Sequence, residues 1–322
     1  MSVAERTVVA DPRAALRADV LAGLAHRPRR LPSKYFYDAR GSALFEAITV
    51  QPEYYLTRVE RELLARHIGA ISAAVGPRAH VVEYGSGSGV KTECLLDALE
   101  APAAYTPVEI SGAALDDCVA RLRLRFPRLD MLPLQADFTG PLTLRRLPSA
   151  ARRLVFFPGS TLGNFDDAEA LALLRAMAAT LGADGLALVG IDLVKDPAII
   201  EAAYNDAAGV TAAFTLNLLA RINRELGADF DLAGFAHQAR YVAARERIET
   251  RLVSLRPQAV RVAGQRFEFS AGQDILVEYS HKYRDARFTA LAAAAGLEVA
   301  GAWGGAAEGF GLRLLRRRAP AG

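Results

Sequence analysis

Three glycines stand at alternate positions in the stretch VVEYGSGSGVK, which runs from residue 81 to residue 91. The β-branched run before them predicts a buried strand, and the residues after them are typical of a helix. Because glycine has no Cβ, Gly85, Gly87 and Gly89 would let a ligand approach the backbone where the helix offers free N–H groups. Glu83 precedes this loop and Lys91 follows it. The pattern predicts a ligand-binding loop.

The spacing of the glycines and the acid before them restrict the class of ligand. A dinucleotide fingerprint has the spacing G-x-G-x-x-G, whereas this loop has the spacing G-x-G-x-G. An acid such as Glu83 just before the turn is unfavourable for a pyrophosphate. It is favourable for a ligand that carries a cation or an amine.

Further acidic and aromatic residues are expected at the ends of the next two strands. A carboxylate at Glu109 can accept both hydroxyls of a ribose, and Asp137 can accept from an adenine amino group while Phe138 packs on the base. S-adenosyl-L-methionine (SAM) fits, since it has a sulfonium, an ammonium and a ribose diol but no phosphate. The predicted cofactor-binding residues are Glu83, Gly85, Gly87, Gly89, Lys91, Glu109, Asp137 and Phe138. A dinucleotide site and a purely structural loop are the competing interpretations, and a helix N-cap would explain Asp137 alone.

An alternation of strands and helices from residue 79 onward would position these residues. Continuous apolar runs that stop at glycine or an acid are typical of buried parallel strands. Strands are expected in 80–85, 103–111, 129–138, 152–160 and 185–194, and helices in 91–99, 112–126 and 166–182. This βαβαβ pattern predicts an α/β fold with a parallel sheet.

The pattern changes at Lys195. Residues 197–225 are predicted to be helical, and residues 238–282 have the alternation of antiparallel strands. A helix at 285–297 and a strand near 309–315 then resume the α/β pattern, while helices are expected in 13–25, 41–49 and 59–75. We therefore expect one domain of residues 61–194 plus 283–322. A second, inserted domain would comprise residues 1–60 plus 195–282, with a binding cleft between the two.

Composition narrows the class of protein. The 322 residues are 52% hydrophobic and 23% charged, with a net charge of only +3, which argues against a dedicated nucleic-acid binder. The arginines at 316–318 are interpreted as a solvated tail. Cys94 and Cys118 are too few for a disulfide framework or a zinc site, so no metal is expected. The charged N-terminus and the lack of an apolar run of about 18 residues predict a cytoplasmic protein without a membrane span.

Several longer stretches carry a resemblance to one family. They are SKYFYDARGSALFEAIT, PEYY, FFPGSTLGNF, AAYNDAAGVTAAF, NRELGADFDL and EYSHKY, and together they cover roughly residues 30 to 315. In these stretches the chain resembles the histidine Nα-methyltransferases of ergothioneine biosynthesis. The resemblance implies a Rossmann-like class I methyltransferase domain with an inserted α+β substrate-binding domain. It also implies up to three methyl transfers from SAM to the α-amine of L-histidine, which give hercynine. We separately expect the protein to be a monomer.

The resemblance also implies the residues of the substrate site. Asn164 and Tyr204 would hold the substrate carboxylate, and Tyr54 would line the pocket. Tyr37 and the carbonyl of Gly159 would lie near the amine as the catalytic groups. The imidazole would be bound by Glu278 and Ser280, and Thr250 would stand beside it.

The residue types support these roles independently. Residues i and i+2 of a strand share a face, so Glu278 and Ser280 can point at one ligand, where a carboxylate and a hydroxyl suit the two imidazole nitrogens. Simpler interpretations remain for each residue taken alone. Tyr54 and Tyr204 could be packing residues, Asn164 could be the N-cap of the helix at Asp166, and Glu278 could be solvated.

The chain departs from the family pattern at several positions. Leu56 stands where proline is expected, Thr250 where a methionine is usual, Tyr279 where asparagine is commoner, and Glu109 where aspartate is usual. The C-terminal stretch WGGAAEGFGLRLL is also unusual. Thr250 matters most, because a smaller side chain could enlarge the pocket and admit tryptophan or tyrosine. A non-catalytic SAM-binding protein and a nucleic-acid methyltransferase are two further hypotheses, and the weak net charge argues against the second.

The expected reaction is an in-line attack of a neutral amine on the sulfonium methyl, for which the protein aligns the reacting atoms. The sequence offers no obvious general base. His281 follows Ser280 directly and is predicted to face the other side of the strand. We expect the amine proton to leave to water, with Tyr37 and the Gly159 carbonyl orienting the amine.

Overall fold

The computed structural model describes residues 11–87, 89–140 and 142–319, which fall into two compact units. The first unit consists of residues 56–195 and 282–319, and the second of residues 11–55 and 196–281. The first expected boundary, before residue 61, lies five residues from the observed one. The expected boundaries after residue 194 and before residue 283 each lie one residue away. The expected domains also included residues 1–10 and 320–322, which lie outside the described part of the chain.

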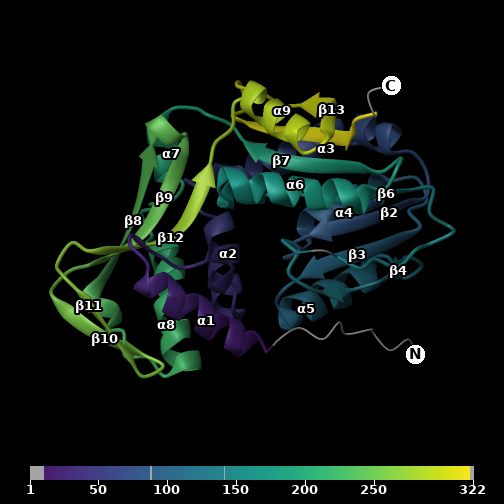
Figure 1. Ribbon diagram of the computed structural model, residues 1–322. Coiled ribbons are helices and arrows are strands. Elements are labelled where there is room, and N and C mark those ends of the chain that lie inside the picture. Colours follow the sequence, from purple (N-terminus) through teal and green to yellow (C-terminus); the bar gives the residue numbers. More distant parts are fainter. Residues whose placement is uncertain (1–10, 88, 141, 320–322) are drawn as a thin grey trace. The chain divides into compact units, whose positions relative to one another are not determined.

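The first unit is built on a large sheet whose strand order is β13-β14-β7-β6-β2-β3-β4, with β5 also paired to β3 (Figure 1). Its strands are β2 (Ala79–Tyr84), β3 (Ala104–Glu109), β4 (Asp130–Met131), β5 (Leu134–Gln135), β6 (Arg152–Phe157), β7 (Leu186–Asp192), β13 (Leu297–Trp303) and β14 (Phe310–Arg317). The strands from β7 to β4 run parallel, whereas β14 is antiparallel to β7. The predicted α/β fold with a mostly parallel sheet is confirmed.

Helices cover the sheet because its strands are apolar on both faces. These helices are α3 (Tyr55–Val75), α4 (Val90–Ala98), α5 (Gly112–Arg125), α6 (Asp167–Leu181) and α9 (Asp285–Ala294). Val82 and Tyr84 of β2 belong to a core that includes residues of α6 and α9. Between them, Glu83 points to the opposite face, toward Thr92 of α4. Helix α6 begins at a capping box formed by Asp166 and Glu169 and ends before Gly182, which agrees with the helix predicted over 166–182.

Two predictions about the strands of this unit are wrong. The third strand, expected in 129–138, is two short pieces, β4 and β5, which pair with opposite ends of β3. Pro133 stands between them and has no N–H to donate to a ladder. In addition, no strand was predicted at β13, which forms an antiparallel edge with β14.

The second unit contains a four-stranded sheet of order β1-β12-β9-β8 and a separate ribbon of β10 and β11. The strands are β1 (Arg29–Arg30), β8 (Phe235–Val242), β9 (Arg247–Ser254), β10 (Gln258–Val262), β11 (Gln265–Phe269) and β12 (Asp274–His281). Its helices are α1 (Pro12–Ala25), α2 (Ala39–Thr49), α7 (Pro197–Ala202) and α8 (Val210–Leu226). Helix α8 packs against β8 and against α2. The predicted antiparallel strands of this region are therefore present.

The helical region expected at 197–225 is interrupted between α7 and α8. Gly209, with φ 73°, precedes α8 in a left-handed conformation that favours glycine. The N-cap position is Gly209 itself, and the Asp206 carboxylate accepts the N–H groups of Val210 and Thr211, the first two residues of α8, at 2.7 and 2.8 Å. Tyr204 consequently lies in a turn and not in a helix.

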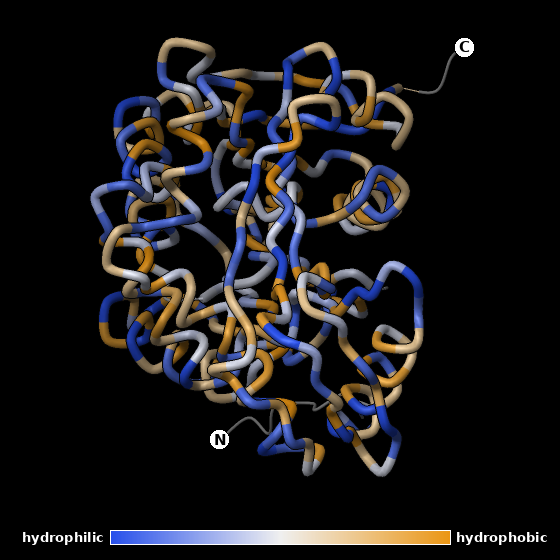
Figure 2. Tube along the Cα trace, turned by 90° about the vertical axis from the view of Figure 1, so that its left-hand side faces the viewer, coloured by the Kyte–Doolittle hydropathy of each residue, from blue (hydrophilic) through white to orange (hydrophobic). Residues whose placement is uncertain are grey.

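Hydropathy is mixed along the chain. In Figure 2, short hydrophobic stretches alternate with hydrophilic residues over the described trace. Among the described residues, no helix combines the length and the hydrophobicity needed to cross a bilayer.

Candidate active site

The glycine loop of the first unit connects β2 to α4 and has a backbone that favours glycine at each predicted position. Gly85, Gly87 and Gly89 have φ values of 72°, 46° and 66°. A Cβ on Gly87 would meet no described heavy atom within 4 Å, whereas one on Gly89 would lie 2.7 Å from a guanidinium nitrogen of Arg121. The loop therefore leaves open space over Gly87 and is closely packed at Gly89.

Glu109, at the end of β3, is tied to this loop. The Gly85 N–H donates to the carbonyl of Val108 at 2.9 Å, and the Glu109 carboxylate accepts backbone N–H groups of Ser111, Gly87 and Ile110. Burial raises the pKa of Glu109, and these backbone donors act in the opposite direction. The structure thus brings Glu109 and Gly87, both predicted to bind the cofactor, together at the carboxyl end of the sheet. Ligands bind at this end in open α/β folds.

Glu83 is held inside the first unit. Its Oε2 accepts hydrogen bonds from the hydroxyl of Thr92, at 2.6 Å, and from that of Tyr105. Burial raises the pKa of Glu83 to about 7, although these two hydrogen bonds and the charge of Lys91 lower it. Near neutral pH Glu83 is therefore only partly ionised, which reduces the negative charge on which its predicted role depends.

Phe138 and Asp137 follow β5 and lie in different surroundings. The Phe138 ring stacks on Tyr84 at 5.6 Å between centroids, and a Cβ on Gly85 would lie 3.5 Å from it. Asp137 Oδ1 accepts the N–H and the hydroxyl of Thr139 at 2.9 and 2.6 Å, as in a turn. Phe138 is thus beside the glycine loop, and one oxygen of Asp137 is used locally.

A strained turn follows β6 and precedes Asn164. Gly159 has φ 81° and Ser160 has φ 56°, so two successive residues adopt left-handed conformations. The Ser160 hydroxyl accepts the N–H of Asp192, at the end of β7, at 2.8 Å. Asn164 ends the short helix η2 (Thr161–Asn164), and the N-cap of α6 is Asp166. The capping interpretation of Asn164 is therefore wrong.

Lys91 is paired with Glu60, a residue to which no role was assigned from the sequence. Its Nζ lies 2.5 Å from Oε2 of Glu60, a residue of α3 that is only 1% exposed. The same carboxylate accepts the N–H of Gly159. An acid within an amphipathic helix is ordinarily solvated. Glu60 stands four residues before Leu64, on the apolar side of the helix, and only this position could have suggested that it is buried.

In the second unit, β9 and β12 bring three predicted substrate residues together. Thr250 is the direct cross-strand partner of Glu278, and its hydroxyl lies 3.4 Å from the Glu278 carboxylate. The register shifts between Leu276 and Glu278, where a bulge re-aims the following side chains. Ser280 lies two residues after Glu278, on the same face.

Tyr204 joins this group through a short hydrogen bond. Its hydroxyl lies 2.6 Å from the Ser280 hydroxyl, and both residues are buried. His237 holds the turn, because its Nε2 lies 2.9 Å from the Tyr204 carbonyl and its Nδ1 lies 3.1 Å from the Thr215 hydroxyl. Burial lowers the pKa of His237, although its hydrogen bond to the Tyr204 carbonyl acts in the opposite direction.

A chain of aromatic contacts connects the remaining predicted residues. Tyr37 packs edge-on against Phe45 at 5.7 Å, Phe45 against Tyr54 at 6.4 Å, and Tyr54 against Tyr204 at 6.4 Å. Such edge-to-face pairs are favourable arrangements of aromatic rings. Phe45 was not assigned a role from the sequence, although it lies in one of the stretches that carry the resemblance.

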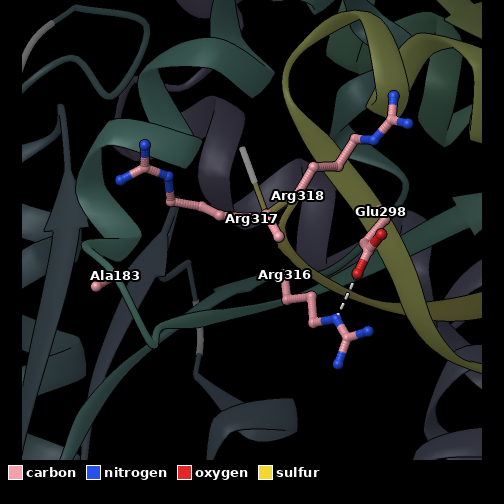
Figure 3. Close-up of a pocket in the computed structure, with 6 residues that line it drawn as sticks. Ala183, Glu298, Arg316, Arg317 and Arg318 are labelled. Atoms are coloured by element: carbon pink, nitrogen blue, oxygen red, sulfur yellow. Dashed lines mark hydrogen bonds and ion pairs between the residues drawn. The ribbon is translucent and has the colours of Figure 1, made fainter. Parts of the chain in front are cut away.

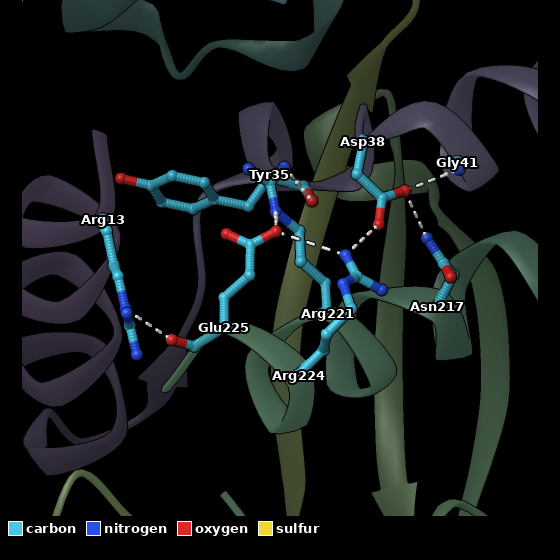
Figure 4. A network of polar contacts seen from close by, with 8 residues as sticks. All are labelled: Arg13, Tyr35, Asp38, Gly41, Asn217, Arg221, Arg224 and Glu225. Carbon is cyan, nitrogen blue, oxygen red and sulfur yellow. Dashed lines mark hydrogen bonds and ion pairs between the residues drawn. The ribbon is translucent and has the colours of Figure 1, made fainter. Parts of the chain in front are cut away.

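A polar network fixes the segment that carries Tyr37. Figure 4 shows Asp38 accepting hydrogen bonds from the Gly41 N–H, Asn217 and Arg224, at 2.7, 2.8 and 2.6 Å. Burial acts to raise the pKa of Asp38, but the hydrogen bonds have the larger combined effect. The pKa of Asp38 therefore lies below its ordinary value. Arg221 adds a hydrogen bond to the Tyr35 carbonyl at 3.1 Å. The network anchors the residues on both sides of Tyr37.

Tyr279, which departs from the family pattern, packs on the other face of β12. The guanidinium of Arg247 lies 3.7 Å from its ring centroid and that of Arg30 lies 4.8 Å away. Since alternate residues face opposite sides of a strand, Tyr279 points away from the face shared by Glu278 and Ser280.

The arginines at 316–318 border a cavity of about 550 Å³ in the first unit, together with Ala183 and Glu298. Their side chains point in different directions, and Arg316 pairs with Glu298 (Figure 3). Arg316 is opposite Leu186, the first residue of β7, whereas Phe310 is opposite Asp192, the last. The cavity is therefore at the end of β7 remote from the turn that follows β6, and it is not part of the predicted site.

Comparison with known proteins finds relatives along nearly the whole chain. A family model described as histidine-specific methyltransferase, SAM-dependent, matches residues 16–317. A histidine N-alpha-methyltransferase of Mycolicibacterium smegmatis is 43% identical over 308 residues, which are 94% of this chain and 95% of the relative. One from Mycobacterium tuberculosis is 40% identical over 308 residues, with the same two coverages. Ergothioneine biosynthesis protein 1 of Neurospora crassa is 28% identical over 90% of this chain and 33% of its own length.

These matches confirm the resemblance inferred from the sequence, and with it the class of enzyme and the use of SAM. The chain belongs to the family of SAM-dependent, histidine-specific methyltransferases.

Proposed function

We propose that this methyltransferase adds up to three methyl groups to the α-amine of L-histidine and so forms hercynine for ergothioneine biosynthesis. The observation that carries the proposal is the group formed by Glu278, Ser280 and Tyr204. It joins a carboxylate and a hydroxyl on one face of β12 with a second hydroxyl 2.6 Å from the first. A carboxylate and a hydroxyl can bind the two nitrogens of an imidazole and select its tautomer.

The roles in the second unit are those that the family resemblance implies, and the chemistry of the residues supports them. Glu278 would accept from one imidazole nitrogen and Ser280 would bind the other. Tyr204 would donate to the substrate carboxylate, with Tyr54 lining the pocket beside it. Tyr37, which Asp38 and its partners anchor, would orient the amine. Tyrosine hydroxyls suit these tasks because they bind a carboxylate or an amine without adding a competing charge.

In the first unit, the residues present fit SAM. The space over Gly87, where a Cβ would meet no described atom, allows a ligand to approach the loop. Glu109 would bind the ribose, Asp137 and Phe138 the adenine, and Lys91 with Gly85, Gly87, Gly89 and Glu83 would complete the site. When bound, SAM supplies an electrophilic methyl group on a sulfonium.

The protein's contribution to the reaction would be alignment. The carbonyl of Gly159 would accept a hydrogen bond from the amine, and the hydroxyl of Tyr37 would make a second hydrogen bond there. Together they would direct the amine's lone pair, while Asn164 would hold the substrate carboxylate. No general base is assigned, and the amine proton would leave to water before each transfer. Repeated transfer requires that these groups release one N–H after another.

A different α-amino acid is the second candidate, and Thr250 favours it. The threonine is buried beside Glu278, and its side chain is smaller than the methionine usual at this position. The extra volume could accept a larger aromatic side chain. The carboxylate of Glu278 argues for the imidazole, because an indole offers one N–H and no basic nitrogen.

Mass spectrometry of a reaction with SAM and an equal mixture of the twenty amino acids tests the proposal. A gain of three methyl groups on histidine alone is expected. Methylation of tryptophan or tyrosine in place of histidine would refute the choice of substrate and support the second candidate. SAM binding without any methylation would support a non-catalytic protein.

We further propose that the enzyme acts as a monomer in the cytoplasm, without nucleic acid or membrane. The net charge of +3 supports the part that concerns nucleic acid, and the two free cysteines support the cytoplasmic location. Light scattering after size exclusion should give the mass of one chain, about 34.6 kDa, and a dimer mass would contradict it.

A further inference from the structure

Glu60 is a buried carboxylate that none of the roles above uses. It belongs to α3 and is 1% exposed, so its charge needs partners inside the first unit. Its two partners come from distant parts of the chain, 31 and 99 residues away, and both lie in segments assigned to the active site. They are the ammonium of Lys91 and the backbone N–H of Gly159.

The contact with Gly159 holds the backbone nitrogen of the residue whose carbonyl is assigned to the amine. The Gly159 N–H lies 2.8 and 2.9 Å from the two oxygens of Glu60. On the other side of the same carbonyl, the Ser160 hydroxyl accepts the Asp192 N–H and the Ser160 carbonyl accepts the Gly163 N–H, both at 2.8 Å. The left-handed conformation costs free energy at Ser160, which has a Cβ, and these contacts offset that cost.

The contact with Lys91 reaches the cofactor loop. Lys91 is the second residue of α4, two positions after Gly89, and its side chain is 20% exposed. Its Nζ lies 2.5 Å from Oε2 of Glu60, and a Cβ on Gly159 would lie 3.4 Å from that Nζ. The lysine, the carboxylate and the turn therefore converge at one point.

The chain leaves room for this carboxylate at Gly190 of β7. A Cβ on Gly190 would lie only 2.2 Å from Oε1 of Glu60 and 3.3 Å from the Gly159 nitrogen. Gly190 does not have the left-handed backbone that requires glycine. The close approach of Glu60 thus gives a steric reason for glycine at this position.

We propose that Glu60 is a positioning residue. It would couple Lys91, which is assigned to the SAM site, to Gly159, whose carbonyl is assigned to orient the acceptor amine. One carboxylate sets both the direction of Lys91 and the peptide plane before Gly159. The part that concerns the amine rests on the proposed function, whereas the part that concerns SAM rests only on the family's cofactor. A purely structural buried ion pair is the competing explanation.

The variant Glu60→Gln tests the proposal, because it keeps the size of the side chain and removes its charge. Glu62→Gln is the matched control, since Glu62 is exposed on the same helix. In Glu60→Gln we expect the Kd for SAM to rise and kcat to fall, each by about 10-fold, the order expected for losing one charged hydrogen bond. The KM for histidine should stay unchanged, because the side chains of Glu278, Ser280 and Tyr204 are untouched.

A double-mutant cycle with Lys91→Met separates positioning from mere stability. Each effect is the ratio of a variant's Kd for SAM to that of the wild type. If Glu60 acts through Lys91, the ratio for the double variant should be smaller than the product of the ratios for Glu60→Gln and Lys91→Met. If Glu60→Gln does not fold, Gly190→Ala takes its place, because the added methyl would displace the Glu60 carboxylate while leaving it charged.

Unchanged SAM affinity and kcat in Glu60→Gln, or effects that multiply independently in the cycle, would overturn the proposal. A fall in thermal stability with normal SAM affinity in the folded fraction would also overturn it, in favour of a structural pair. If the wild type binds SAM but does not methylate histidine, the proposed function fails. The cycle on SAM affinity still decides the role of Glu60 in that case.

Discussion

Stability of the first unit should fall as pH rises, because Glu83 is buried beneath the glycine loop. Its pKa is about 7 in the folded protein, against an ordinary value of 4.5. At about 1.4 kcal/mol for each pKa unit, this difference corresponds to about 3 kcal/mol. Since the folded-state pKa is raised, the stabilising contribution is fully present below pH 4.5. It is lost as pH rises toward 7, with a slope of about 1.4 kcal/mol per pH unit.

Glu83→Gln is the perturbation that isolates this effect. The amide is neutral at every pH, and its oxygen can still accept the hydroxyls of Thr92 and Tyr105. Relative to the wild type, the variant should be more stable by up to about 3 kcal/mol at pH 8.5 and of similar stability at pH 4.5. Urea unfolding between these pH values measures this, followed by the fluorescence of Trp303, the single tryptophan, which lies in the first unit.

The same titration tests whether the charge of Glu83 helps to bind SAM. If it does, SAM affinity should increase as pH rises through about 7 in the wild type and should stay level in Glu83→Gln. Glu62→Gln, on the surface of α3, should behave as the wild type does. Equal pH dependence of unfolding in the wild type and in Glu83→Gln would refute the reasoning, because burial would then not be perturbing this carboxyl.

Three further predictions concern other parts of the site. Tyr204→Phe should raise the KM for histidine about 10-fold and cost about 1–2 kcal/mol of stability, because the buried Ser280 hydroxyl loses this hydrogen bond; steady-state kinetics and urea unfolding measure this, and an unchanged KM would contradict it. Asp38→Asn should lower kcat and leave the Kd for SAM unchanged, and the wild type should lose stability as pH falls below about 3.8, since the Asp38 pKa is lowered. Gly87→Ala should weaken SAM binding with a stability loss of about 1 kcal/mol, whereas Gly89→Ala, which meets a guanidinium, should lose more stability; calorimetry that finds the two variants alike would contradict the assignment of open space to Gly87.

Much of the first unit could be predicted because its signals are local. Apolar runs that end at glycine or an acid mark buried parallel strands, and the capping residues of α6 mark its start. The third strand and the helical region after Lys195 were predicted less well. A proline at 133 and a left-handed glycine at 209 interrupt them, and the surrounding hydrophobic pattern continues across both positions.

The sequence by itself determined the positions that need special backbone or strand-end chemistry. Gly85, Gly87 and Gly89 have positive φ, and Glu109 stands at the end of β3, because both properties depend on a few adjacent residues. The stretches that resemble the family also determined the cofactor and the class of reaction.

Only the tertiary structure decided which side chains act together. Glu60 meets Gly159 from 99 residues away, and Tyr204 meets Ser280 from 76 residues away. Phe45 joins Tyr37 to Tyr54 although nothing in its local pattern distinguishes it from an ordinary core residue. Such contacts depend on how helices and strands pack after they form, and neither residue propensity nor hydrophobic period encodes that packing.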